Sequence, residues 1–340
     1  MMGPLLKVEN LAVEFGPRQK PLRVLEGVSF EVPTGGAVGI VGESGSGKSV
    51  TSLSIMRLLS DPPARVVGGR IELEGVNLLD LPRGRMPQIR GRDIAMIFQE
   101  PMSSLNPVMT IGDQIAEGIM LHENISREER RQKVVELLRL VGMPDPESRL
   151  SAYPHQFSGG MRQRVMIAMA VACNPKLLIA DEPTTALDVT IQAQVLDLMR
   201  NVRRRLNTAV LIISHDLGVI AEIAERVIVM YAGRVLEEGD VRSIFRNPMH
   251  PYTRGLLKSV PRLKDERKRL YQIPGSVPLA GSIKQGCPFH ARCELRIDKC
   301  AGEMPPMFTV GAGQKAACWV TAGDRPATPS AGLLSTGALS

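Results

Sequence analysis

The amino-acid sequence predicts an α/β fold built on a mostly parallel sheet with helices on both faces. Apolar segments at residues 37–41, 177–180 and 209–213 have no alternation with polar residues, which is typical of strands buried on both sides. Segments with helical spacing of apolar residues alternate with these strands along the chain. A glycine-rich stretch at residues 42–47 follows the first strand and directly precedes a helical pattern.

The remaining elements continue this alternation in order. Ser126 and Glu129 have the spacing of a helix capping box, and Gly142 marks the end of the same helix. After about residue 240 the pattern weakens into short helices and a segment rich in Pro and Cys. The expected strands are 5–15, 24–32, 37–41, 70–79, 93–98, 177–180 and 209–213, and the expected helices are 50–59, several within 111–172, and 191–206, with a helix and strand pair in 217–229.

Length and composition limit the classes of protein. A chain of 340 residues corresponds to about two domains, and 44% hydrophobic with 23% charged residues excludes global disorder. The longest clean apolar run, residues 165–173, is far shorter than the ~20 residues that span a bilayer. The N-terminus lacks the basic and apolar regions of a secretory signal. We therefore expect a soluble protein that stays in the cytoplasm.

The formal charge of +7 allows anionic ligands, but its distribution argues against nucleic acid. The basic residues are spread along the chain and form no charged tail. Seven Phe, four Tyr and one Trp are too few to provide stacking platforms for bases. We expect no nucleic-acid partner.

Residues 42–49 carry the strongest chemical signal, because they fit the phosphate-loop (Walker A) pattern G-x-x-x-x-G-K-[ST] between a strand and a helix. Glycines let backbone N–H groups surround a phosphate, and the helix N-terminus favours negative charge. Lys48 is expected to reach the β- and γ-phosphates and Ser49 to bind Mg²⁺. An ordinary Gly/Ser turn is the alternative. The expected nucleotide-binding residues are Gly42, Glu43, Ser44, Gly45, Ser46, Gly47, Lys48, Ser49 and Val50.

Two carboxylates end the apolar run at 177–180. Asp181 is expected to act on the Mg²⁺ shell, and Glu182 to polarise a water for attack on the γ-phosphate. Taken alone, this pair is more often a solvated strand end. The phosphate loop upstream favours the catalytic interpretation.

A third signal is Ser158-Gly159-Gly160 at the start of an apolar helix. Such a sequence is a potential anion site, although on its own a Ser N-cap followed by a flexible turn is the more frequent explanation.

The order of these motifs resembles the ATP-binding subunit of an ABC transporter over about residues 5–245. Gln99, Ser158-Gly159-Gly160, Asp181-Glu182, residues 185–188 and His215 occur in the order found in that family. The resemblance implies a P-loop NTPase fold with an inserted helical subdomain at about residues 100–172.

The resemblance also implies roles for single residues. Gln99 contacts Mg²⁺ and senses the transmembrane partner, and Asp188 ends the loop after the carboxylates. Ser158, Gly159 and Gly160 contact ATP held by an opposite subunit, and His215 lies near the γ-phosphate. Phe15 is at the position of the adenine-stacking aromatic residue, with core packing as the alternative.

Further segments at residues 100–107, 230–234 and 250–253 resemble the oligopeptide and dipeptide permease branch. This implies import of peptides across the bacterial inner membrane, powered by ATP hydrolysis at the cytoplasmic face. The implied partners are a second ATPase subunit (identical or a sister chain), two transmembrane permease subunits and a periplasmic solute-binding protein. Nickel or another solute is an alternative cargo, and an ATPase acting on ribosomes or DNA is an alternative class.

Four of the five cysteines lie near the C-terminus, and the fifth, Cys173, is expected to be a core thiol. The spacing of the four C-terminal cysteines is C-x5-C-x6-C-x17-C. It predicts one metal centre, an iron–sulfur cluster of the four-iron type, with zinc or unligated thiols as alternatives. We expect this centre to lie away from the phosphates, in an extension at residues 246–320, and residues 321–340 to be disordered. The cysteines are Cys287, Cys293, Cys300 and Cys318.

Overall fold

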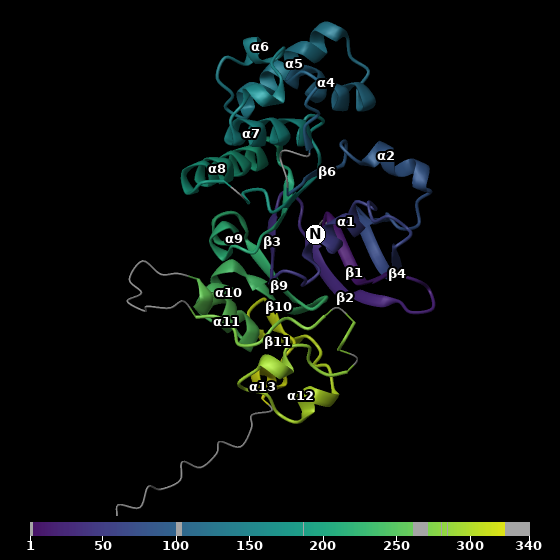
Figure 1. Cartoon of the computed structure of the whole chain (residues 1–340), viewed down its shortest axis with the longest axis vertical. Helices are drawn as coiled ribbons and strands as arrows, with labels where there is room; N and C mark the ends of the chain where they lie inside the picture. The colour runs from purple at the N-terminus through teal and green to yellow at the C-terminus, as the bar shows by residue number, and fades with distance from the viewer. Residues whose placement is uncertain are drawn as a thin grey trace, which may run out of the picture.

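An eight-stranded sheet forms the centre of the computed structural model (Figure 1). Its strand order is β11-β12-β10-β9-β3-β8-β7-β6, and the run from β9 to β6 is parallel. The strands are β3 (Ala37–Val41), β6 (Ile94–Ile97), β7 (Leu177–Asp181), β8 (Ala209–Ile213), β9 (Arg226–Tyr231), β10 (Arg234–Asp240), β11 (Phe308–Gly311) and β12 (Gln314–Ala316). The structure describes residues 3–99, 104–185, 187–260, 271–279, 281–283 and 285–323.

A second, antiparallel sheet of four strands packs on one face of the first. Its strands bury one side only, and those side chains share a core with β3, β7 and β8. The sheet has the order β2-β1-β4-β5 and consists of β1 (Leu6–Phe15), β2 (Leu22–Val32), β4 (Ala64–Leu73) and β5 (Val76–Asn77).

Helices cover the other face and form a separate lobe. Residues of α8 and α9 pack with the parallel strands in the main core, and the lobe containing α4, α5 and α6 lies above them in Figure 1. The Ser126–Glu129 capping box is present, and Gly142 follows the helix end with φ 70°. The helices are α1 (Lys48–Ile55), η1 (Arg83–Arg85), α2 (Met86–Ile89), α4 (Ile111–His122), α5 (Arg127–Leu140), α6 (Pro146–Arg149), η2 (Pro154–Gln156), α7 (Gly159–Ala170), α8 (Val189–Leu206) and α9 (Leu217–Ile223).

The C-terminal region lies at the end of the molecule opposite this helical lobe (Figure 1). It extends the main sheet, because β12 pairs with β10 at Glu237 and Glu238. Its helices are α10 (Val241–Arg246), α11 (Pro251–Ser259), η3 (His290–Arg292), α12 (Lys299–Gly302) and α13 (Trp319–Ala322).

The predicted fold class is confirmed, with two differences. The expected strand at 70–79 is longer and broken: β4 begins at Ala64, and Glu74 and Gly75, both with positive φ, turn the chain into β5. The short strands β11 and β12 were not expected, since four and three residues carry little periodicity. Residues 100–103 and 324–340, which include most of the predicted disordered tail, lie outside the described residues.

Candidate active site

The phosphate loop connects β3 to α1, as the sequence predicts. Gly47 precedes the helix with φ 99°, and a Cβ there would lie 2.5 Å from Cδ2 of Leu25. A Cβ on Gly42 would lie 2.2 Å from the carbonyl oxygen of Met230. Only glycine fits at these two positions, because the loop backbone lies close against its neighbours.

Lys48 is the buried cation of this loop, with 6% of its surface exposed. Its Nζ donates to the carbonyl oxygens of Gly42 at 2.8 Å and Glu43 at 3.1 Å. Burial lowers its pKa, and the carboxylates of Glu182 and Asp181 oppose that shift. Ser46 Oγ is also buried and has no hydrogen-bond partner within the described residues. A buried ammonium and an unpartnered hydroxyl suit an anionic ligand.

Asp181 ends β7 with 5% of its surface exposed. Ser49 Oγ donates to its Oδ1 at 3.2 Å, and Ser52 Oγ donates to its Oδ2 at 3.3 Å. Burial raises the pKa of Asp181, while these two hydroxyls act in the opposite direction. The oxygen donors of Ser49 and Asp181 are of the kind that Mg²⁺ prefers, so the residues fit this ion. Ser52 was not anticipated, although its position one turn after Ser49 places it on the same side of α1.

Glu182 follows with φ 48°, and its carboxylate is held from three sides. Gln99 Nε2 donates to Oε2 at 3.1 Å, and Thr185 Oγ1 donates to the same oxygen at 2.9 Å. His215 Nδ1 lies 3.2 Å from Oε1. The side chain of His215 is 62% exposed, whereas that of Glu182 is 15% exposed. Three of the predicted residues, from the ends of β6, β7 and β8, therefore meet at one point.

The Ser158-Gly159-Gly160 stretch, called the signature here, lies at the start of α7, and Asp188 lies at the start of α8; together they form the signature end. Ser158 is the N-cap of α7 and accepts from the backbone N–H of Met161 at 3.4 Å. Asp188 is the N-cap of α8 and accepts from the N–H of Ile191 at 2.9 Å. Gly160 faces Ile191, since a Cβ on it would lie 2.8 Å from Cγ2. Within the described part of the chain, these hydrogen bonds run inside α7 and α8 and not to the phosphate loop. Ser158, Gly159 and Asp188 are exposed.

Two further predicted residues border the antiparallel sheet. Phe15, the last residue of β1, is half-buried and packs against the core of that sheet, as Val50 of α1 also does. This packing agrees with the structural alternative for Phe15. Its contact with adenine stays a prediction.

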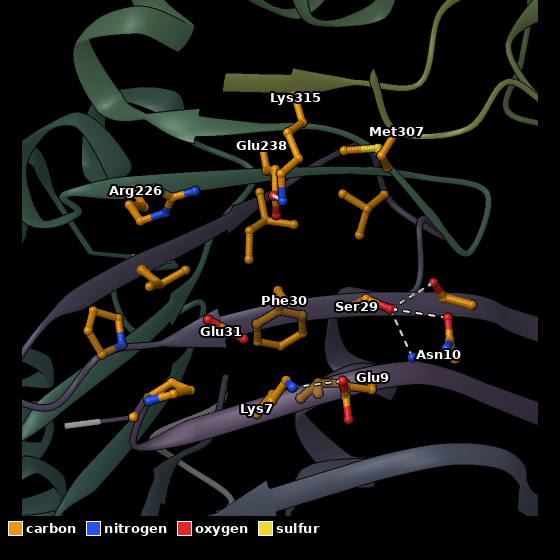
Figure 2. Close-up of a pocket in the computed structure, with 18 of the residues that line it drawn as sticks. Lys7, Glu9, Asn10, Ser29, Phe30, Glu31, Arg226, Glu238, Met307 and Lys315 are labelled. Atoms are coloured by element: carbon orange, nitrogen blue, oxygen red, sulfur yellow. Dashed lines mark hydrogen bonds and ion pairs between the residues drawn. The ribbon is translucent and has the colours of Figure 1, made fainter. Parts of the chain in front are cut away.

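A cavity of about 980 Å³ lies at the opposite edge of the main sheet from the phosphate loop (Figure 2). Val38 at the beginning of β3 and Arg226 at the beginning of β9 line it. Its charged side chains are largely paired, with Lys7 on Glu9 at 2.8 Å and Lys315 on Glu238 at 2.9 Å. This cavity therefore lies away from the phosphate loop, and its paired charges leave little net charge to attract an anion such as a phosphate.

Comparison with known proteins identifies the family. The ABC transporter family model matches residues 25–185, and the model described as the oligopeptide/dipeptide transporter C-terminal region matches residues 236–300. The probable peptide ABC transporter ATP-binding protein y4tR of Sinorhizobium fredii is 54% identical over 93% of this chain and 94% of that protein. The oligopeptide transport ATP-binding protein AppD of Bacillus subtilis is 50% identical over 94% and 97%.

The chain belongs to the ATP-binding proteins of peptide ABC transporters. The dipeptide transport ATP-binding protein DppD of Escherichia coli, 49% identical over 92% of this chain and 96% of that protein, agrees with this assignment. Proteins of this family are ATPases, and so is this ABC subunit. None of the helices in the described ranges is long and apolar enough to cross a membrane.

Solved structures of ABC cassettes share the fold. The dimeric cassette MJ0796 bound to ADP and Pi matches with a TM-score of 0.62 and 28% identity, over 70% of this chain and 99% of that one. The cassette cbiO1 of Clostridium perfringens matches with a TM-score of 0.62 and 25% identity, over 72% and 91%.

The prediction of an iron–sulfur cluster is wrong. Among the residues that the structure describes, no group of three or more His, Cys, Asp or Glu side chains is arranged to hold a metal ion, and the relatives are named simply as ATP-binding proteins. Zinc is unsupported for the same reason. Burial raises the pKa of Cys287 to about 12 and that of Cys293 to about 11, so these thiols are neutral core groups. The four buried cysteines are Cys287, Cys293, Cys300 and Cys318.

Proposed function

We propose that this ABC subunit hydrolyses ATP to power import of oligopeptides or dipeptides across the bacterial inner membrane. The observation that carries the proposal is the convergence of Lys48, Asp181 and Glu182 at one edge of the parallel sheet. The match of residues 236–300 to a peptide-transporter C-terminal region, and the names of the relatives, support peptides as the cargo. As a subunit of such a transporter it acts at the cytoplasmic face of the membrane.

The geometry supports a separate role for each group of residues in hydrolysis. The phosphate loop binds the β- and γ-phosphates through its N–H groups and Lys48. Ser49, Asp181 and Gln99 would hold Mg²⁺, and the ion would neutralise phosphate charge. Glu182 orients and polarises the attacking water, because Gln99 and Thr185 both donate to its Oε2 and fix the orientation of the carboxylate. His215, the exposed member of the group, reaches toward the γ-phosphate.

The exposed signature residues support a head-to-tail dimer. Ser158 and Gly159 form the N-terminal end of the 12-residue α7, where unpaired backbone N–H groups favour an anion. Their separation from the chain's own phosphate loop leaves them free to contact ATP in a second subunit. The solved cassette MJ0796, which shares this fold, is dimeric. The second subunit is either an identical chain or a sister ATPase.

The helical lobe supports docking of the permease subunits. A groove of about 710 Å³ between α4 and α5 is lined by Met109, Met120 and Arg131, among others. Leu121, next to Met120, is 74% exposed, and Val108 is 79% exposed. Apolar side chains that protrude beside a groove are typical of a protein interface. A periplasmic solute-binding protein completes the proposed transporter by delivering the cargo.

Reconstitution tests this function. The chain is assembled with its permease subunits in proteoliposomes, and ATP-dependent accumulation of labelled dipeptides and oligopeptides is measured with the solute-binding protein present. We expect accumulation in the wild-type complex and none with Glu182→Gln. Accumulation of nickel and not of peptides would show that nickel, and not a peptide, is the cargo. ATP turnover that responds to ribosomes or DNA, and not to the permease, would overturn the proposal.

A further inference from the structure

The C-terminal region contacts the phosphate loop directly, contrary to the expectation that it lies away from the phosphates. Arg292, at the end of η3, forms a paired ion bridge with Glu43, the second residue of the loop. Nη1 lies 2.7 Å from Oε2, and Nη2 lies 3.1 Å from Oε1. The Arg292 side chain is only 6% exposed, and that of Glu43 is 29% exposed. Paired Arg–carboxylate contacts fix both distance and orientation.

Arg292 is itself held in place by its neighbours. Its Nε donates to the carbonyl oxygen of Pro274 at 2.9 Å, and Nη2 donates to that of Ile273 at 3.1 Å. Nη1 also donates to the hydroxyl of Tyr231 at 3.2 Å. The guanidinium is therefore satisfied on several sides and rigidly aimed at Glu43. An arginine held this way differs from a flexible surface ion pair, which contributes little.

A second contact fixes the backbone of the same residue. The N–H of Glu43 donates to the hydroxyl of Tyr252 at 2.8 Å. Tyr252 is fully buried, and its ring packs on Tyr231 and Phe289 with centroid separations of 4.6 and 5.3 Å. Burial raises the pKa of Tyr252, so its hydroxyl stays neutral and accepts this hydrogen bond. Both the side chain and the backbone of Glu43 are thus held by residues beyond β9.

Holding Glu43 affects the phosphate site in two ways. Its carbonyl oxygen accepts from Lys48 Nζ at 3.1 Å, so the orientation of Glu43 helps to set the position of that ammonium. Its carboxylate is also a negative charge on a loop that binds polyphosphate. If it were unpaired, this charge would repel the ligand. The ion bridge removes that repulsion.

We propose that Arg292 is a positioning residue for nucleotide binding: it neutralises and orients Glu43, and the C-terminal region thereby sets the affinity of the phosphate loop for ATP. This inference rests on the proposed function, in that residues 42–49 hold ATP. It gives the C-terminal region a role in the ATPase site that the cysteine pattern did not suggest.

The experiment measures Kd for MgATP by isothermal titration with the full-length chain. We expect Arg292→Gln to weaken binding about tenfold, because it leaves Glu43 unpaired beside the phosphates. Adding Glu43→Gln should restore most of the affinity by removing the repelling charge. Arg292→Lys keeps the charge without the paired hydrogen bonds and should give an intermediate Kd. Arg296→Gln, an exposed arginine of the same region, is the matched control.

Thermal unfolding of each variant separates lost affinity from lost structure, and Kd is compared among the folded variants. If Arg292→Gln does not fold, the Kd of Arg292→Lys is compared with that of the wild type instead, and a weaker Kd supports the inference. Wild-type affinity in the folded Arg292 variants would overturn the inference. A double variant as weak as Arg292→Gln would also overturn it, since the loss would then come from damage to the C-terminal region. Absence of MgATP binding by the wild-type chain would instead overturn the proposed function.

Discussion

The phosphate-loop edge and the signature end of this chain differ in how many of their functional side chains contact one another within the chain. At the phosphate-loop edge, side chains from the ends of β6, β7 and β8 contact one another, and Asp181 is buried against the helix that follows the loop. At the signature end, Ser158 and Asp188 are exposed, and their side chains accept hydrogen bonds from the first turns of their own helices. In the head-to-tail dimer proposed above, one chain would supply one half of an ATP site through internal contacts and present the other half to solvent.

The difference follows from the chemistry of the two surfaces. Parallel strands bring their carboxyl ends to one edge, so residues distant in sequence meet without help from a partner. A helix N-terminus offers N–H groups and a partial positive charge, but it needs an anion brought to it. Substitutions at the phosphate-loop edge should therefore act within one chain. Substitutions at the signature end should act only when two subunits meet.

The largest effect is expected at Glu182. Glu182→Gln keeps the shape of the side chain and its neighbours but removes the charge that polarises water, and such assistance is worth ~10²–10⁴ in rate. Turnover of the assembled transporter should fall by about that factor, while the Kd for ATP stays close to wild type. Phosphate release and nucleotide titration measure the two quantities. Glu222→Gln, an exposed glutamate on α9, is the control, and normal turnover by Glu182→Gln would contradict the assigned role.

The next effect tests the signature end. Ser158→Arg places a large cation where the phosphates of the opposite subunit are expected. Cooperative hydrolysis should be lost, by about 10²-fold or more in turnover. ATP binding to the isolated chain should hardly change, because Ser158 makes no hydrogen bond to its own phosphate loop among the described residues. Ser148→Arg on α6 controls for an added surface charge. Equal loss of binding in the isolated chain would show that the two ends belong to one site.

The sequence predicts the phosphate-loop edge better than it predicts the C-terminal region. Strand-end carboxylates and a glycine loop have local signals, so the positions of Lys48 and Asp181 follow from the order of strands and helices. The contact of Arg292 with Glu43 spans 249 residues and has no local signal. Likewise, the spacing of the cysteines shows that they are close in sequence, but not whether their sulfur atoms converge on a metal. In the folded chain they are buried core thiols.

A smaller effect is expected at Lys48, where the comparison predicts loss of binding rather than of chemistry. Lys48→Ala removes a buried cation that lies on two loop carbonyls, and hydrogen bonds to charged groups are worth ~1.5–3 kcal/mol. ATP affinity of the isolated chain should fall roughly tenfold to a hundredfold. Nucleotide titration measures it, with the exposed Lys20→Ala as the control. Unchanged affinity would remove Lys48 from the phosphate site.

The smallest effect concerns the stability of the region that supports Glu43. His250 is buried, and its Nδ1 accepts from the backbone N–H of Tyr252 at 3.0 Å, so the folded state holds it neutral. Burial, aided by the nearby Arg254, lowers its pKa from 6.5 to about 3. Below pH 6.5 the unfolded chain binds a proton that the folded chain excludes, so stability falls as the pH is lowered toward 3.

Between pH 7.5 and 5.5 this one group should reduce the free energy of unfolding by about 1.4 kcal/mol. His250→Asn offers the same N-cap acceptor without a titrating ring. Chemical denaturation of both proteins at the two pH values should show a pH-dependent loss that is larger in the wild type by about that amount. Because the His250 ring stays neutral in the folded chain over this range, the contact of Tyr252 with Glu43 is kept, and His250 should not change the affinity of the folded chain for ATP. Equal pH dependence in the two proteins would mean that His250 takes up its proton in the folded state, and that the support of the phosphate loop is less rigid than the packing indicates.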